Sequence, residues 1–124
     1  MTRFRRRLVA LGAAALGALG LLLGGTLASA TGGAGEAASK THTVLLTGFV
    51  FKPKTLSARA GDKVKFVWRD GVHNIVTVVG PSKITAKKPT DHRPPLIVTL
   101  KKGNYRLICE PHELVGMVIT MRVR

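Results

Sequence analysis

The residues best suited to chemistry lie close together near the C-terminal end of the sequence. Cys109, His112 and Met117 place a thiol, an imidazole and a thioether within nine residues, in the pattern C-x2-H-x4-M. Cys109 is the only cysteine, so an intramolecular disulfide is excluded, and a buried thiol, a nucleophile and a metal ligand remain. Sulfur with imidazole suits copper, and two His, one Cys and a weak axial Met are typical of electron-transfer copper centres. The pattern therefore predicts a copper site that still lacks one histidine.

The flanking residues predict a strand, a loop and a second strand that turn these side chains toward one point. From Tyr105 to Cys109 every second residue faces the interior, which places the sulfur at the C-terminal end of a strand. Pro111 ends the ladder pairing, and Gly116 permits a tight turn before a strand opens at Met117. Met117 also shares its face of that strand with other apolar residues, so core packing is an open alternative for it.

The second histidine is expected from a different strand. His73 follows a turn signal at Asp70-Gly71 and precedes the β-branched run from Ile75 to Val79, so it lies at the mouth of a strand. The remaining histidines, at positions 42 and 92, have no partner at ligand spacing, and we expect both to be solvated.

With these residues in place, the sequence resembles the cupredoxins, or small blue copper proteins, and most closely the plastocyanin and amicyanin group. The resemblance covers roughly His42 to Arg124. It rests on Gly61-Asp62-Lys63-Val64 before Trp68, on His73-Asn74, on Gly103-Asn104-Tyr105, and on Cys109-Glu110-Pro111-His112 closing at Gly116-Met117.

The resemblance implies one type 1 copper ion bound by His73, Cys109, His112 and Met117. It also implies that the backbone N–H of Asn74 donates to the Cys109 sulfur, and that the Asn74 side chain ties its strand to the ligand loop. In the family the edge of the C-terminal histidine ligand reaches the surface through an apolar patch where electrons pass, which here corresponds to His112.

The chain departs from its relatives at two surfaces. Leu114 and Val115 stand where plastocyanin has smaller residues, so we expect an electron-transfer patch of different shape around His112. Plant plastocyanins carry an acidic docking patch, and the counterpart here, residues 81–92, contains Lys83, Lys87 and Lys88. A partner that docks by charge is therefore expected to be acidic.

The N-terminal residues have the pattern of a secretory signal peptide. A basic start at residues 3–7 precedes an apolar run at 8–23 and the cleavage signal Ala28-Ser29-Ala30, which predicts a signal peptide at 1–30. An uncleaved membrane anchor is the alternative. Residues 31–41 are Gly/Ala-rich and form a predicted flexible linker, and residues 42–124 form one predicted domain exported to the periplasm or the cell surface.

The domain has the texture of an all-β protein. Short apolar runs alternate with turn residues, as in Val64, Phe66 and Trp68, and no amphipathic helix is evident. Residues 82–95, with three prolines, predict a long connection with at most one short edge strand. The expected fold is a Greek-key β-sandwich of about seven or eight strands.

Charge and length limit the function classes. Residues 31–124 keep 16 Lys and Arg against 6 Asp and Glu, a net charge near +10. This charge suits acidic redox proteins or an anionic membrane surface, or serves solubility alone. Nucleic acid is disfavoured because aromatic residues are few and mostly face inward. We expect a monomer.

Two functional hypotheses follow from these residues. The first is an exported one-electron carrier in which copper cycles between Cu(II) and Cu(I). The second is a copper-binding or copper-delivery module without an electron-transfer role. Zinc is a weaker alternative, because a thioether is a poor zinc ligand. An enzyme is disfavoured, because Ile108 and Glu110 flank the cysteine where multicopper oxidases have histidines that reach a further copper cluster.

Overall fold

The computed structural model describes Gly35 and residues 37–124. The predicted signal peptide, at 1–30, lies outside the described residues, as does part of the predicted linker. Residues 37–40 have no regular secondary structure, and the first strand begins at Thr41. Among the described residues, no helix has both the length and the apolar character needed to cross a membrane.

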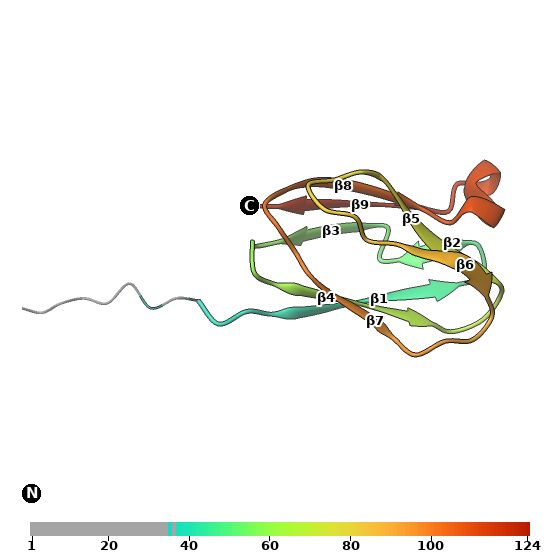
Figure 1. The fold of residues 1–124 in the computed structure, drawn as a ribbon, viewed down its shortest axis with the longest axis horizontal. Helices are drawn as coiled ribbons and strands as arrows, with labels where there is room; N and C mark the ends of the chain where they lie inside the picture. Colours follow the sequence, from blue (N-terminus) through green and yellow to red (C-terminus); the bar gives the residue numbers. More distant parts are fainter. Residues whose placement is uncertain (1–34, 36) are drawn as a thin grey trace, which may run out of the picture. The chain divides into compact units, whose positions relative to one another are not determined.

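Two β-sheets pack face to face (Figure 1), which confirms the predicted all-β sandwich. The four-stranded sheet has the order β2-β1-β4-β7 and the five-stranded sheet the order β3-β9-β8-β5-β6. The elements are β1 (Thr41–Thr47), β2 (Val50–Lys52), β3 (Thr55–Ala58), β4 (Lys63–Trp68), β5 (His73–Val79), β6 (Ala86–Thr90), β7 (Leu96–Thr99), β8 (Gly103–Ile108), the 3-10 helix η1 (Glu110–Val115) and β9 (Val118–Val123).

The described part of the chain has nine strands, against the seven or eight expected. β6 is the additional edge strand, and it forms inside the proline-rich connection because β5 offers it a free edge to pair with, at His73 with Thr90 and at Ile75 with Ala86. The segment between β8 and β9, expected as a loop, contains η1. Pro111 near its first position and the left-handed Gly116 at its end are compatible with this short helix.

The core lies between the sheets and follows the predicted alternation. Val64, Phe66 and Trp68 of β4 are buried. The residues that alternate with them are Lys63, which is exposed, and Lys65 and Val67, which are half-buried. Phe66 packs edge-on against Phe51 of β2, with 6.5 Å between ring centroids. Burying side chains of this size contributes about 1.5–3 kcal/mol each, so the core holds both sheets in the register that positions the site.

The candidate ligands lie at one end of this sandwich. β5 begins there and β8 ends there, and η1 caps the same end, away from the C-terminus and the start of β1 (Figure 1). Strand ends that are distant in sequence therefore meet at one edge of the core.

Candidate metal centre

Three of the four predicted ligands converge in the structure. His73, Cys109 and His112 each offer one donor atom, and these atoms all lie within 4.8 Å of one another. The Cys109 Sγ lies 3.7 Å from Nδ1 of His73 and 3.5 Å from Nδ1 of His112. His73 and Cys109 are fully buried, while His112 is half-buried.

These separations fit a shared metal ion. Ligand bonds of about 2.0 Å to nitrogen and about 2.3 Å to sulfur, meeting at trigonal angles, place the two atoms about 3.8 Å apart. The observed sulfur to nitrogen distances of 3.7 and 3.5 Å are close to that value. A thiolate with two imidazoles is also the donor set that copper prefers.

His73 is held at both its ring and its backbone. Its Nε2 lies 2.6 Å from the backbone carbonyl oxygen of Asp70, and because a carbonyl only accepts, Nε2 carries the proton. The lone pair of Nδ1 then faces the cluster. Burial lowers the pKa of the His73 imidazole, which favours the neutral form that binds metal. The indole Nε1 of Trp68 donates to the His73 carbonyl oxygen at 3.1 Å.

The loop that precedes His73 is itself anchored to the β1–β2 turn. The carboxylate of Asp70 accepts hydrogen bonds from the backbone N–H of Gly48 and from the Thr47 hydroxyl. The Gly48 N–H, followed by the Thr47 hydroxyl, holds the pKa of the Asp70 carboxyl below its usual value. Asp70 is therefore ionised and anchors the turn. Gly71 adopts φ +77, a conformation that glycine allows and that this turn requires.

The ligand loop is closed by backbone hydrogen bonds. The N–H of Cys109 donates to the Met117 carbonyl oxygen at 3.1 Å, and the N–H of Met117 donates to the His112 carbonyl oxygen at 3.1 Å. Gly116 adopts φ 84, which reverses the chain so that Met117 is fully buried beside the other candidate ligands. Its placement is compatible with a weak axial ligand and with core packing.

Asn74 joins the β5 strand to this loop. Its side-chain Nδ2 donates to the Glu110 carboxylate at 2.7 Å and to the Lys87 carbonyl oxygen at 3.0 Å, and its Oδ1 accepts the Glu110 N–H at 2.8 Å. Burial raises the pKa of the Cys109 thiol, whereas hydrogen bonds from the backbone N–H groups of Asn74 and His112 lower it. A metal ion that binds here must therefore displace the thiol proton.

The exposed rim of the cluster is apolar. The ring of His112 packs edge-on against Phe49, with 5.0 Å between centroids, and Phe49 is itself 61% exposed. Leu114 is fully exposed, and Val115 and Val72 are 65% and 48% exposed. We call these four residues and His112 the apolar rim. Phe49 was not identified from the sequence because its contact with His112 depends on the fold. Val72 was not identified either, although it directly precedes His73.

One histidine was wrongly expected to be solvated. His42 Nε2 lies 2.9 Å from the carboxylate of buried Asp62, at the end of β1 opposite the cluster. The pairing was missed because β1 and β4 run parallel and bring together residues 20 positions apart. His92 is exposed, as expected.

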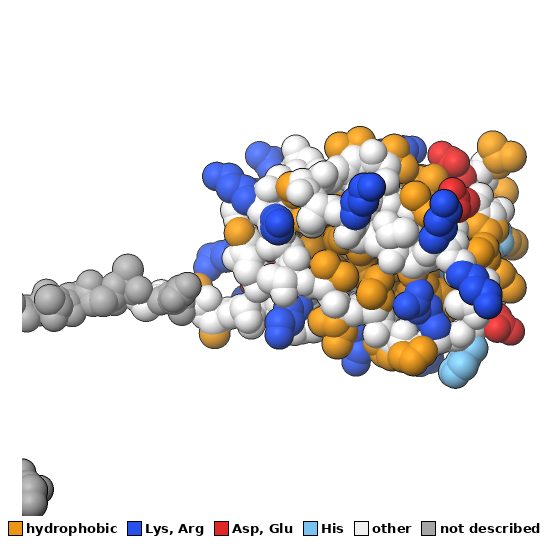
Figure 2. All heavy atoms as spheres, viewed as in Figure 1, with side chains coloured by type: hydrophobic (Ala, Val, Ile, Leu, Met, Phe, Trp, Pro, Cys, Tyr) orange, Lys and Arg blue, Asp and Glu red, His pale blue; other side chains and the backbone are white. Residues whose placement is uncertain are grey.

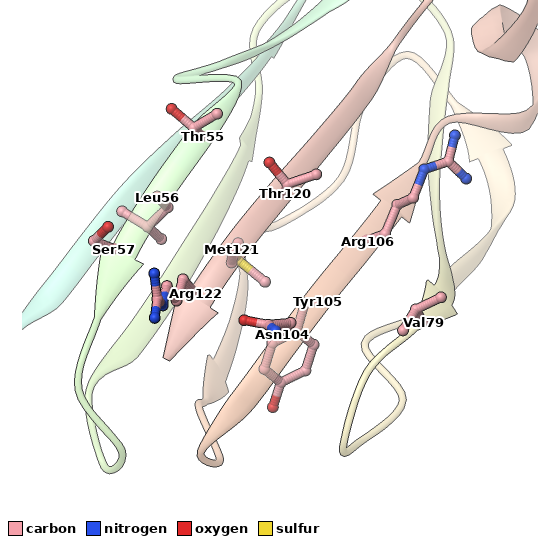
Figure 3. A pocket seen from close by; sticks show the side chains of 10 residues that line it. All are labelled: Thr55, Leu56, Ser57, Val79, Asn104, Tyr105, Arg106, Thr120, Met121 and Arg122. Atoms are coloured by element: carbon pink, nitrogen blue, oxygen red, sulfur yellow. The ribbon is translucent and has the colours of Figure 1, made fainter. Parts of the chain in front are cut away.

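A separate hollow of about 430 Å³ lies over β3, β9 and β8. Thr55, Thr120 and Arg106 are among its lining residues, and none of the candidate ligands is (Figure 3). Lysine and arginine side chains are scattered over the face of the domain seen in Figure 2, and Lys83, Lys87 and Lys88 are exposed.

Comparison with known proteins matches residues 37–124 to the family model of copper binding proteins, plastocyanin/azurin family. Pseudoazurin of Methylorubrum extorquens is 34% identical over 71 residues, which are 56% of this chain and 48% of that protein. The chain thus spans about half the length of this curated relative.

Two solved structures show the same fold. Native pseudoazurin from Hyphomicrobium denitrificans superposes with a TM-score of 0.57 at 31% identity, over 67% of this chain and 74% of that one. The copper-containing nitrite reductase of Thermus scotoductus superposes with a TM-score of 0.54 at 29% identity, over 66% of this chain and 22% of that one. The chain therefore belongs to the plastocyanin/azurin family of copper-binding proteins, the cupredoxins, and its cofactor is copper.

Proposed function

We propose that the protein is an exported one-electron carrier with a type 1 copper site formed by His73, Cys109, His112 and Met117. The observation that carries this proposal is the position of the apolar rim. Three of the four ligands are fully buried, and only His112 is accessible, in contact with exposed Phe49. An electron would have a short route to the surface there, while the other three donor residues are enclosed.

Copper bound at this site supplies a Cu(II)/Cu(I) couple. The protein's part is to keep the donor atoms still while the charge changes, since little movement allows fast electron exchange. Asp70 and Trp68 restrain His73, and Asn74 restrains the loop that carries Cys109. These restraints come from several strands, so they act together only in the folded domain.

A carrier is favoured over an enzyme because three of the four candidate ligands are fully buried and none of the four lines the hollow over β3, β9 and β8. The copper-containing nitrite reductase superposes over only 22% of its own length. Within residues 37–124 the only group of at least three His, Cys, Asp or Glu side chains placed to hold a metal ion is His73, Cys109 and His112. A copper-delivery role is disfavoured by burial, because release of the ion requires the loop from Cys109 to Met117 to open.

We infer export from the signal-peptide pattern of residues 1–30. We infer an acidic redox partner from the positive charge of the domain. Lys83, Lys87 and Lys88 are exposed on and next to β6, which pairs with β5, the strand that begins at His73. An acidic redox protein would be steered to this surface and would place its own centre near His112.

Electron self-exchange tests this proposal without knowledge of the partner. Val115→Ser removes an apolar group from the rim and should slow self-exchange, with the reduction potential nearly unchanged. Val79→Ser is the matched control, because Val79 is similarly exposed at the other end of β5. Equal rates in both variants would contradict an electron route through the rim.

Added salt should have opposite effects on self-exchange and on electron transfer to an acidic partner. Two copies of this basic domain repel one another, so self-exchange should accelerate as salt is added, while transfer to an acidic protein should slow. Rates that do not respond to salt would leave the positive charge without a docking role.

A further inference from the structure

We propose that Trp68 and Arg93 together position His73, with Arg93 acting through Trp68. This inference rests on the proposed copper site for its functional meaning, but not for its geometry. Trp68 is the last residue of β4 and is 8% exposed. Its indole N–H donates to the His73 carbonyl oxygen at 3.1 Å, in a buried hydrogen bond between the two sheets.

Arg93 covers the indole from the segment between β6 and β7. Its Cζ lies 4.9 Å from the centroid of the Trp68 ring, which is the spacing of a cation–π contact. Its Nε is buried and has no hydrogen-bond partner among the residues that the structure describes. A buried N–H without a partner is unfavourable. We infer that packing of the planar guanidinium on the Trp68 ring offsets this cost and keeps the side chain in place.

The backbone around Arg93 favours this position. Pro94 and Pro95 follow it directly, and proline fixes its own φ and restricts the residue before it to extended conformations. Arg93 therefore has little backbone freedom, and its half-buried side chain lies over Trp68.

The consequence concerns the ligand. The ring of His73 is held by the Asp70 carbonyl, and its backbone is held by pairing with Thr90 of β6 and by the Trp68 hydrogen bond. The pairing with Thr90 lies at the edge of the sheet, so the Trp68 hydrogen bond is the restraint that ties the His73 backbone to the opposite sheet. Arg93 shields the Trp68 hydrogen bond from water, so the backbone restraint persists, and the donor Nδ1 keeps its place in both copper states.

The first test needs no copper. Trp68 is the only tryptophan of the chain, so the protein has one indole N–H resonance. Arg93→Ala should speed the exchange of this proton with solvent by on the order of fivefold, as expected for loss of a cation–π contact. Arg106→Ala is the charge-matched control on the outer side of β8 (Figure 3), and should leave the exchange rate unchanged. Equal exchange in all three proteins would overturn the proposal.

The second test asks whether the restraint reaches the metal. Trp68→Phe keeps an aromatic ring in the core but removes the N–H donor. We expect copper to bind, the EPR spectrum to become more rhombic, and self-exchange to slow several-fold. Arg93→Ala should change the EPR spectrum and the self-exchange rate in the same direction, but by less. Arg93→Lys keeps the charge but loses the planar stack, so its spectrum and rate should resemble those of Arg93→Ala. A Trp68→Phe protein with the parent EPR spectrum and rate would show that Trp68 is core packing alone. If the parent protein failed to bind copper, the proposed function would be wrong. The indole exchange test would still show whether Arg93 protects the Trp68 hydrogen bond, because it needs no copper.

Discussion

Asn74→Ala is the substitution with the most informative expected effect on this domain. The Asn74 side chain is fully buried and makes three hydrogen bonds, two with Glu110 and one with Lys87. They connect β5, β6 and the ligand loop across residues that are 13 and 36 positions apart. Alanine removes all three and leaves the Glu110 N–H without this acceptor.

The magnitude follows from the kinds of bond lost. A neutral hydrogen bond contributes about 0.5–1.5 kcal/mol, and one to a charged group about 1.5–3 kcal/mol. The Glu110 carboxylate is exposed, so we take the lower ends of these ranges, and two neutral bonds and one charged bond predict that the free energy of unfolding falls by at least about 2.5 kcal/mol. In a domain of this size each kcal/mol lowers Tm by about 4–8 °C, so we expect Tm to fall by at least about 10 °C.

Thermal and urea unfolding of the metal-free protein measures this change. Thr77→Val is the matched control, because the Thr77 hydroxyl makes two hydrogen bonds of 2.7 Å with the backbone of Ile84, farther along β5 from the ligands. Both variants should be less stable, but only Asn74→Ala should also alter the EPR spectrum of the copper form. A loss below about 1 kcal/mol, or an unaltered spectrum, would refute the reasoning.

Two further predictions concern the axial position and the far end of the sandwich. Met117→Leu should keep the blue site and raise its reduction potential, whereas an unchanged potential in voltammetry would show that Met117 only packs in the core. Hydrogen bonds from the Lys40 N–H, and next from the His42 imidazole, hold the pKa of the Asp62 carboxyl far below its usual 3.8. A lowered folded-state pKa contributes stability that is present above the unfolded value and lost as the pH falls below it. Asp62→Asn should therefore flatten the loss of stability below about pH 4 in acid unfolding curves, and an equally steep acid limb would argue against this role.

The fold was largely predictable because its signals are local. The alternation of Val64, Phe66 and Trp68 indicates a half-buried strand without knowledge of its neighbours, and the structure buries those three residues. Cys109 and His112 are close in sequence, so their meeting depends on one loop. His73 was predictable as a strand-end residue, although its distance from Cys109 depends on the pairing of β5 with β8.

The supports of the site were harder to predict because they depend on tertiary contacts. The stacking of Arg93 on Trp68 joins residues 25 positions apart from segments in no obvious register. Phe49 follows the two turn residues that Asp70 binds, Thr47 and Gly48, and its contact with His112 joins residues 63 positions apart. Residues that make such contacts are not separated by any characteristic number of positions, so neither periodicity nor motifs in the sequence predict them.

The most direct test of the central claim is a visible absorption and EPR spectrum of the protein titrated with Cu(II) and then reduced, with Cys109→Ala as the control. The account predicts an intense blue charge-transfer band and narrow copper hyperfine splitting at one ion per chain, bleached by reductant and absent from a folded Cys109→Ala protein. A colourless or ordinary tetragonal copper complex, or a variant that stays blue, would contradict it.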